Sequence, residues 1–170
     1  MKFLSGQKTV WQPDENVNVE QEVAYTLDSL GRLTVDKSVS VSVEPKGLRA
    51  EVEGSKFRQI LRNLIRNALR ALIGKENGAL QIAACSTLDA LDIRIQDNGK
   101  GMTPEQLADL FRGKPSDLLK KGIGFQIARQ YVIEEAGGRL DVESSVDAGT
   151  LVTISIPVKT KDNNYDNSSL

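Results

Sequence analysis

The sequence predicts an α+β fold, a two-layer sandwich in which one mixed, mostly antiparallel sheet carries helices packed on a single face. Segments with helical and strand periodicity follow one another in the order helix, strands, helix, strands, helices, strands. This order lacks the regular strand–helix–strand alternation of a parallel α/β fold. With 170 residues, of which 39% are hydrophobic, the chain suits one domain with its own core.

The first part of the chain contains two predicted helices separated by a predicted hairpin. Apolar residues at helical spacing indicate a helix over 19–30. Alternating serine and valine at 38–43 indicate a half-buried strand, and residues 48–52, beyond a turn at 45–47, are its expected hairpin partner. A broad apolar stripe then indicates a long helix over 56–73.

The rest of the chain also combines strands with helices. Alternation of apolar and polar residues predicts four more strands, at 80–86, 91–96, 139–144 and 150–156. Two helices are expected between the second and third of these strands, at 104–111 and at about 122–135. Pro104 favours a helix start, because proline fits the first helical turn.

Composition excludes several kinds of chemistry. The net charge of −1 leaves no basic excess to hold a nucleic-acid backbone, so no nucleic acid partner is expected. No apolar run approaches the roughly 20 residues that span a bilayer, and residues 1–6 lack the apolar stretch of a secretory signal, so we expect a cytoplasmic chain without direct membrane contact. The absence of histidine excludes a Ser-His or Cys-His nucleophile and a Cys-His zinc site. The one cysteine, Cys85, lies in an apolar run and is expected in the core.

Two asparagines one helical turn apart, Asn63 and Asn67, share a face of the long predicted helix, and Arg70 follows one turn later. Amide oxygens are hard ligands that suit Mg²⁺, which usually shares its shell with waters and substrate phosphates. Asn67 is the better ligand candidate, and Arg70 is placed to neutralise phosphate oxygens. Taken alone, these residues are equally well explained as ordinary exposed positions on a helix.

Asp97 ends an apolar predicted strand, where a partly buried carboxylate needs hydrogen-bond donors. The exocyclic amine of adenine is such a donor. Gly99 and Gly101 allow the backbone to turn tightly and to approach a flat base, and Met102 is placed to lie against that base. An Asp-Asn-Gly turn is also a routine loop, and that interpretation stays open at this point.

A third motif lies where a polar loop becomes the last predicted helix. Backbone N–H groups at Gly122 and Gly124, together with the positive end of the helix dipole, suit phosphate oxygens. Lys120 and Lys121 add positive charge, although basic residues in such a stretch are also common in solvated loops. In sequence order, the three motifs supply partners for a metal ion, a base and phosphates, which predicts a nucleotide pocket.

These motifs resemble the ATP-binding domain of sensor histidine kinases, a branch of the GHKL group that also includes DNA gyrase B, heat-shock chaperones and mismatch-repair ATPases. The similar segments are residues 57–68 for the asparagine box of that family, 97–102 for its first glycine box, Phe111 for its phenylalanine box and 121–125 for its second glycine box. The resemblance extends over about residues 18–157. It implies the Bergerat-type version of the predicted sandwich.

The resemblance implies a role for each residue of the pocket, with ATP and Mg²⁺ as cofactors. Asn67 is expected to ligate Mg²⁺, with Asn63 and Arg70 supporting the phosphates as catalytic residues. Asp97 is expected to bind the adenine amine, and Thr150 to help hold the base. The remaining cofactor-binding residues come from the two glycine boxes: Gly99, Gly101, Met102, Lys121, Gly122, Ile123, Gly124 and Phe125.

The resemblance also implies a domain organisation. Residues 1–17 are expected as a lead-in from a missing dimerisation and histidine-phosphotransfer domain, residues 18–158 as the ATP-binding catalytic domain with an ATP lid at 103–121, and residues 159–170 as a disordered tail or linker. The isolated domain is expected to be monomeric, because dimerisation resides in the missing helices. Its expected partners are that phosphotransfer domain and a downstream response regulator, and the parent protein can be membrane-anchored.

Asn63 distinguishes between branches of the group. In its self-sufficient ATPases a glutamate at this position acts as a base, whereas an amide cannot accept a proton at neutral pH. With no histidine in the chain, this favours a protein-histidine kinase domain that transfers the γ-phosphoryl of Mg-ATP to a histidine on a separate domain. One alternative is a catalytically degenerate nucleotide-binding docking module, motivated by Lys120 and Ala136, which stand where glycine and histidine are usual in the family. The other alternative is a structural domain that binds no nucleotide.

Overall fold

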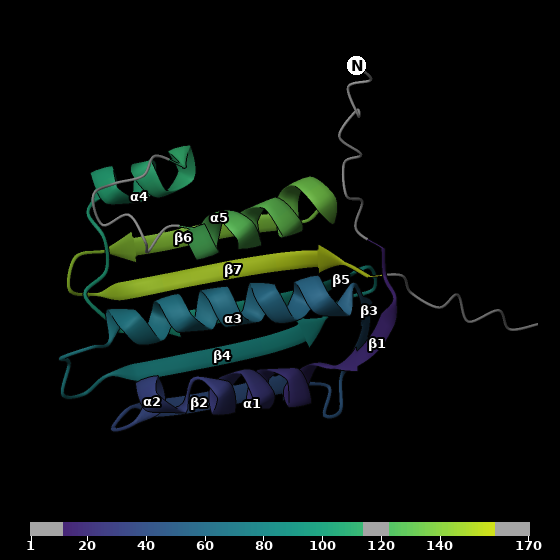
Figure 1. Ribbon diagram of the computed structural model, residues 1–170, viewed down its shortest axis with the longest axis horizontal. Helices are drawn as coiled ribbons and strands as arrows, with labels where there is room; N and C mark the ends of the chain where they lie inside the picture. The colour runs from purple at the N-terminus through teal and green to yellow at the C-terminus, as the bar shows by residue number, and fades with distance from the viewer. Residues whose placement is uncertain (1–11, 114–122, 159–170) are drawn as a thin grey trace, which may run out of the picture.

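The computed structural model describes residues 12–113 and 123–158, and these form two layers (Figure 1). Within these ranges, one layer is a five-stranded sheet in the order β2-β4-β5-β7-β6, in which only β2 and β4 pair in parallel. Its strands are β2 (Ser38–Glu44), β4 (Ala79–Ser86), β5 (Ala90–Asp97), β6 (Arg139–Ser145) and β7 (Gly149–Pro157). The predicted α+β sandwich with a mixed, mostly antiparallel sheet is therefore confirmed.

The second layer consists of helices that cover one face of the sheet (Figure 1). Its elements are α1 (Val19–Ser29), α2 (Gly31–Thr34), α3 (Gly54–Ala71), α4 (Pro104–Arg112), α5 (Ile123–Arg129) and a π-helical continuation of α5, η1 (Gln130–Glu135). α3 lies between α1 and α5, and α4 lies at one end of the layer. α4 begins where the sequence predicts, because Thr103 and Gln106 form a reciprocal capping box and proline occupies the first turn.

The predicted hairpin between residues 38–43 and 48–52 is wrong. β2 pairs in parallel with β4, beginning with Ser38 opposite Ala79. The alternation of serine and valine specifies a strand and its inward face, on which Val43 is buried, but it does not specify the partner. The partner of β2 comes from a segment beyond α3, which local periodicity does not reveal.

β3 (Arg49–Val52) pairs instead with β1 (Glu15–Asn18), antiparallel, in a separate two-stranded sheet. Val17 and Val52 are buried there, and β1 contacts α3. The predicted end of the lead-in at residue 17 falls inside β1. The last residues of that segment therefore pack with the rest of the fold.

The core lies between α3 and the sheet. Its largest fully buried side chains include Phe57, Ile60, Leu61, Ile65 and Leu69 from α3, Leu80 and Ile82 from β4, and Leu91, Ile93 and Ile95 from β5. Alternation along β4 turns Leu80, Ile82 and Ala84 inward. Cys85 is odd-numbered and is exposed, so its expected place in the core is wrong.

Replacing Ile65 with alanine is expected to lower the free energy of unfolding by about 2–5 kcal/mol, because Ile65 is fully buried and its loss leaves a cavity under α3. Urea denaturation followed by circular dichroism measures this change. Gln59→Ala, on the exposed side of the same helix, is the control and should change stability by less than about 0.5 kcal/mol. Equal losses in the two variants would contradict the proposed core.

Candidate functional site

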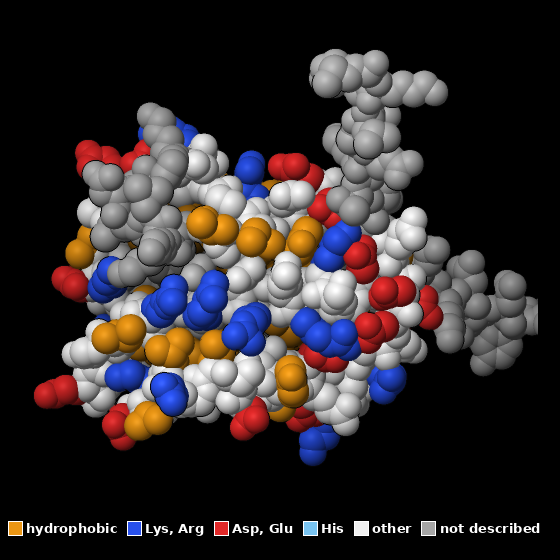
Figure 2. All heavy atoms as spheres, in the orientation of Figure 1, with side chains coloured by type: hydrophobic (Ala, Val, Ile, Leu, Met, Phe, Trp, Pro, Cys, Tyr) orange, Lys and Arg blue, Asp and Glu red, His pale blue; other side chains and the backbone are white. Residues whose placement is uncertain are grey.

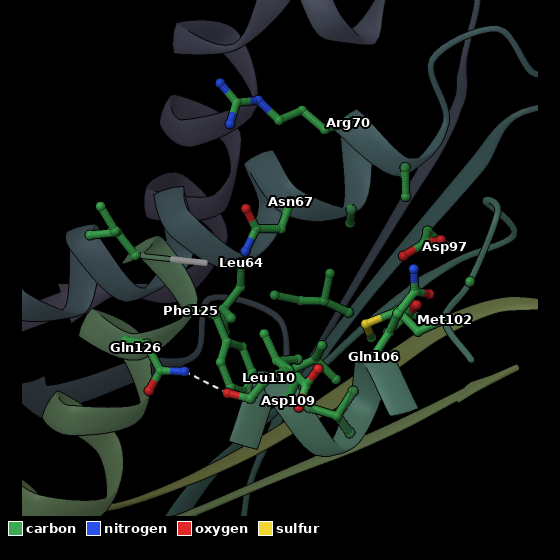
Figure 3. Close-up of a pocket in the computed structure, with 18 of the residues that line it drawn as sticks. Leu64, Asn67, Arg70, Asp97, Met102, Gln106, Asp109, Leu110, Phe125 and Gln126 are labelled. Atoms are coloured by element: carbon green, nitrogen blue, oxygen red, sulfur yellow. Dashed lines mark hydrogen bonds between the residues drawn. The ribbon is translucent and has the colours of Figure 1, made fainter. Parts of the chain in front are cut away.

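A cavity of about 760 Å³ opens between α3, α4, α5 and the adjoining ends of β5 and β7 (Figure 3). This volume falls in the range of small-molecule sites. Most of the residues predicted for a nucleotide pocket line it: Asn67, Arg70, Asp97, Gly101, Met102, Ile123, Phe125 and Thr150. Residues from both halves of the chain therefore meet at one site.

Asn67 and Arg70 reach the cavity from the last turns of α3. Figure 3 shows these two side chains on one side of the cavity and Asp97 with Met102 on another. Leu64 also lines the cavity from α3, because residues three and four apart share a helix face. The cavity thus has a polar, positively charged region next to an apolar wall.

Asp97 is the last residue of β5 and is only 4% exposed. The Gly99 backbone N–H donates a hydrogen bond to its Oδ1 at 2.8 Å. Burial raises the pKa of the Asp97 carboxyl above its ordinary value, and hydrogen bonds from the Gly99 and Thr150 backbones and the charge of Lys75 act in the opposite direction. A partly desolvated carboxylate that lines a cavity is well suited to accept a hydrogen bond from a neutral amine.

The turn after Asp97 is held tightly between two other parts of the chain. The Lys100 N–H donates to the Ala71 carbonyl at the end of α3, and the Lys100 carbonyl accepts from the Asp147 N–H in the β6–β7 turn at 2.8 Å. Gly101 has a φ of 60°, and a Cβ there would lie 1.9 Å from the Ser145 carbonyl oxygen. Only glycine fits this position, which agrees with the tight turn that the sequence predicts.

Asn98 is a supporting residue that the sequence analysis missed. Its side-chain Oδ1 accepts from the Ala79 N–H and its Nδ2 donates to the Asn77 carbonyl, both at 2.8 Å. The Lys75 ammonium donates to the Asn98 backbone carbonyl. Asn98 therefore ties the turn that carries Asp97 to the start of β4. A single Asp-Asn-Gly motif contains no signal for these distant contacts.

Thr150 stands opposite Asp97 in the β5–β7 pairing. Its hydroxyl lies 2.9 Å from that of Ser144, and the Ser144 hydroxyl donates to the Gly149 carbonyl at 3.0 Å. Since a hydroxyl has one proton, Thr150 is the donor to Ser144. Ser144 thereby orients Thr150 beside the cavity, and it is a second residue that sequence reasoning missed.

Asn63 does not line the cavity, although it shares a helix face with Asn67. It is 7% exposed, and its Oδ1 accepts from Arg66 Nη2 at 3.2 Å. A Cβ added to Gly124 would lie 3.0 Å from that oxygen, so the small residue lets α5 pack closely over Asn63. The structure thus places Asn63 between α3 and α5, next to the cavity wall.

α4 contributes to the cavity as part of the predicted lid. Leu110 and Asp109 line the cavity, and Gln126 Nε2 donates to the Leu110 carbonyl at 2.5 Å (Figure 3). The rings of Phe111 and Phe125 meet edge to face at 5.8 Å. Gln126 is a further residue that no sequence motif indicated. These contacts hold α4 against α5.

Two predicted residues, Lys121 and Gly122, lie outside the described ranges, as does the part of the lid from residue 114. Among the residues that the structure describes, no group of three or more carboxylate, cysteine or histidine side chains is placed to hold a metal ion. The amide of Asn67 fits a cation that takes most of its other ligands from phosphate and water.

A scan of family models finds one that matches residues 52–160, the family described as histidine kinase-, DNA gyrase B-, and HSP90-like ATPases. The chain belongs to this ATPase family. The matched segment contains the whole cavity, from the amide on α3 to Thr150. The predicted resemblance to the GHKL group is confirmed.

Curated relatives of this chain include sensor kinases. The sensor histidine kinase ZraS of Klebsiella oxytoca is 29% identical over 85% of this chain and 31% of its own length. Sporulation kinase B of Bacillus subtilis is 34% identical over 71% of this chain and 28% of its own length. The chain thus spans about a third of the length of these relatives.

Solved structures of histidine kinase catalytic domains share the fold. The catalytic domain of ThkA superposes with a TM-score of 0.71 at 21% identity, covering 84% of this chain and 94% of that one. The mycobacterial sensor histidine kinase MprB gives 0.67 at 23% identity, covering 85% and 97%. In the described part of this chain, no helix combines the length and apolarity needed to cross a membrane.

Proposed function

We propose that this chain is the ATP-binding catalytic part of a sensor histidine kinase, which binds Mg-ATP and transfers the γ-phosphoryl group to a histidine on a separate domain. Membership of the ATPase family supports ATP as the ligand. The convergence of Asp97 and Asn67 on one cavity, in a chain without histidine, is the observation that carries the proposal. The kinase relatives support a protein as the acceptor.

The adenine end of the site is proposed at Asp97. The buried carboxylate accepts the exocyclic amine, and guanine would present a carbonyl oxygen to the same carboxylate. Thr150 lies opposite Asp97 in the β5–β7 pairing, and Met102 lies near Asp97 in Figure 3. Both line the cavity and are proposed to hold the base. Gly101 lines the cavity and is proposed to let the backbone approach the base, whereas Gly99 does not line it and packs against Ala71 and the Asp97 carboxylate.

The phosphate end is proposed at α3 and the start of α5. Asn67 would hold Mg²⁺, and the ion would supply charge neutralisation for the phosphates. Arg70 would pair with phosphate oxygens, and Ile123 and Phe125 bring part of the second glycine box to the same cavity. Lys121, Gly122 and Gly124 stay predicted partners of the phosphates. Asn63, behind Gly124, is proposed to support this region by positioning Arg66 and α5.

The proposed transfer breaks the bond between the γ-phosphorus and the oxygen that remains on ADP, and it forms a bond to a ring nitrogen of the acceptor histidine. The ring proton passes to a base on the acceptor's own domain, because the Asn63 amide cannot accept it. This chain contributes positioning and charge neutralisation. The partners are the dimerisation and phosphotransfer helices of the parent protein, proposed to meet this chain in the cytoplasm, and a response regulator like that solved with ThkA.

Mixing the chain with Mg-ATP and the phosphotransfer helix pair of its parent kinase is expected to yield phosphohistidine on the helix pair. Radiolabelled γ-phosphate that is acid-labile and base-stable measures this product. The chain alone is expected to bind an ATP analogue but not to sustain hydrolysis at the ordinary enzyme range of about 1–10³ s⁻¹. Steady hydrolysis in that range by the chain alone would contradict the assignment.

A nucleotide-binding docking module without transfer is a second candidate. Its supporting observation is that Asn63 contacts Arg66 instead of lining the cavity. The same mixing experiment separates the candidates: tight binding of the analogue with no phosphohistidine would favour the docking module.

A further inference from the structure

Four arginines occur at every fourth position along α3: Arg58, Arg62, Arg66 and Arg70. We call them the arginine row. Figure 2 shows it as a band of blue side chains across the middle of the helix-covered face. Four residues of an α-helix rise about 6 Å, so the Cα atoms of the arginine row recur at that interval along the helix.

Only the first member of the arginine row has a carboxylate partner in the described part of the chain. Arg58 pairs with Glu15 at 2.6 Å and with Glu22 at 3.1 Å. Arg70 lines the nucleotide cavity, whereas Arg62 and Arg66 do not. Neither of these two central arginines therefore lines the proposed nucleotide site.

The arrangement is unfavourable for the isolated fold. Like charges four residues apart repel on a helix surface. Burial, followed by the charges of Arg70 and Arg62, lowers the pKa of Arg66 from its ordinary value. Within the described residues, Arg66 Nε is also buried without a hydrogen-bond partner. Local conflicts of this kind are typical of functional surfaces.

We propose that the arginine row is a docking surface for a protein partner that presents a helix with carboxylates one turn apart. Glutamates at i and i+4 of a partner helix are also about 6 Å apart, so they match the spacing of Arg62 and Arg66. The guanidinium fork binds carboxylates in a bidentate manner. Charge and spacing are therefore both complementary.

A nucleic acid backbone fits this surface less well. A long polyanion laid along the arginine row would meet Glu15 and Glu22 at the Arg58 end, and the chain carries no net positive charge. A short acidic helix can end before those carboxylates. The observations thus favour a protein partner over nucleic acid.

The proposal is tested with a labelled alanine-rich peptide of about 20 residues that carries glutamate at every fourth position. A peptide with glutamine at the same positions is the control. Fluorescence anisotropy with the full chain is expected to show binding of the glutamate peptide only, weakening as salt is raised. Arg62→Glu is expected to weaken that binding about ten-fold, because attraction becomes repulsion at the centre of the surface.

Arg94→Glu is the matched control variant. Arg94 is exposed on β5, and its replacement by glutamate changes the net charge by the same amount as Arg62→Glu. It should leave peptide binding unchanged. Arg62→Glu should leave binding of a Mg-ATP analogue unchanged, because Arg62 does not line the cavity. It should not lower the melting temperature, because it replaces the repulsion of residue 62 from Arg58 and Arg66 with attraction. This separates failure of the docking proposal from failure of the nucleotide site.

Three results would overturn the docking proposal. They are no binding of the glutamate peptide, equal losses in the Arg62→Glu and Arg94→Glu variants, and tighter binding of a DNA duplex of about 20 base pairs than of the peptide. Binding of an ATP analogue measured in the same samples shows whether each variant is folded. A lost docking signal with intact nucleotide binding is the expected pattern for Arg62→Glu.

Discussion

The Asp97→Asn variant is expected to bind an ATP analogue at least about 100-fold more weakly than the wild type. Asp97 is buried at the end of β5, where the carboxylate accepts from the Gly99 N–H. An amide at this position replaces one acceptor oxygen with an NH₂ group. Two donors, this group and the adenine amine, then meet, and no hydrogen bond forms between them. Leaving such buried polar groups unpaired costs about 1–3 kcal/mol each. Isothermal titration calorimetry measures the change.

Asp92→Asn provides the control for this experiment, because Asp92 lies on the same strand but does not line the cavity. Its affinity for the analogue should equal that of the wild type. Similar losses of affinity for the analogue in the two variants, or full affinity in Asp97→Asn, would show that Asp97 does not bind the nucleotide.

The pH dependence of stability gives an independent check on Asp97. Burial raises the pKa of its carboxyl in the folded state above the unfolded value. The favourable contribution from Asp97 is then fully present below the unfolded pKa and is lost as the pH rises through the folded pKa. Asp97→Asn is expected to remove this part of the pH dependence, as measured by urea denaturation from pH 3 to pH 7.

Affinity for the nucleotide should vary with pH in the opposite sense. A donor amine stabilises the ionised carboxylate, so binding is expected to weaken as the pH falls through the raised pKa of Asp97. A wild-type affinity that is constant through the titration of Asp97 would contradict its contact with the base.

The Asn67→Ala variant is expected to lose at least about 100-fold in phosphoryl transfer to the acceptor helices. Asn67 is the amide that lines the cavity from α3, and it is the proposed Mg²⁺ ligand of this chain. The wild type should bind an ATP analogue more tightly with Mg²⁺ than without it, and the variant should lose most of that difference. Titrations with and without Mg²⁺ measure both effects.

Gln59→Ala is the control for Asn67→Ala, because it removes an amide from the exposed side of the same helix. It should retain both the Mg²⁺ effect and phosphoryl transfer. If Asn67→Ala binds the analogue with an undiminished Mg²⁺ effect, the metal ion is held elsewhere.

Local sequence patterns predicted much of the fold and the cavity, because apolar periodicity determines which face of a helix or strand is buried and a positive φ requires glycine. The apolar stripe specifies α3 and therefore the side on which Asn67 and Arg70 stand. The apolar alternation of β5 ends at Asp97, and glycine at 101 is required by a positive φ. The family resemblance added Thr150, which lies opposite Asp97.

Long-range packing accounts for what sequence reasoning missed. Periodicity identified β2 and β3 as strands but could not show that they belong to different sheets. Helical spacing placed Asn63 beside Asn67, whereas α5 approaches Asn63 closely at Gly124 and leaves Asn67 to line the cavity. Ser144 and Gln126 act through contacts with residues in other elements, and no spacing rule indicates such contacts.

The short turn between β6 and β7 reaches the turn that follows Asp97, through the hydrogen bond from Asp147 and the close approach of Gly101 to Ser145. Surface hairpin tips are ordinarily the places where a tag, a reporter or an extra loop can be inserted without harm. In this molecule such an insertion would displace Lys100 and Gly101, which line the end of the cavity proposed to bind the base. Insertions are therefore expected to be tolerated at other surface turns of this chain and not at the turn between β6 and β7.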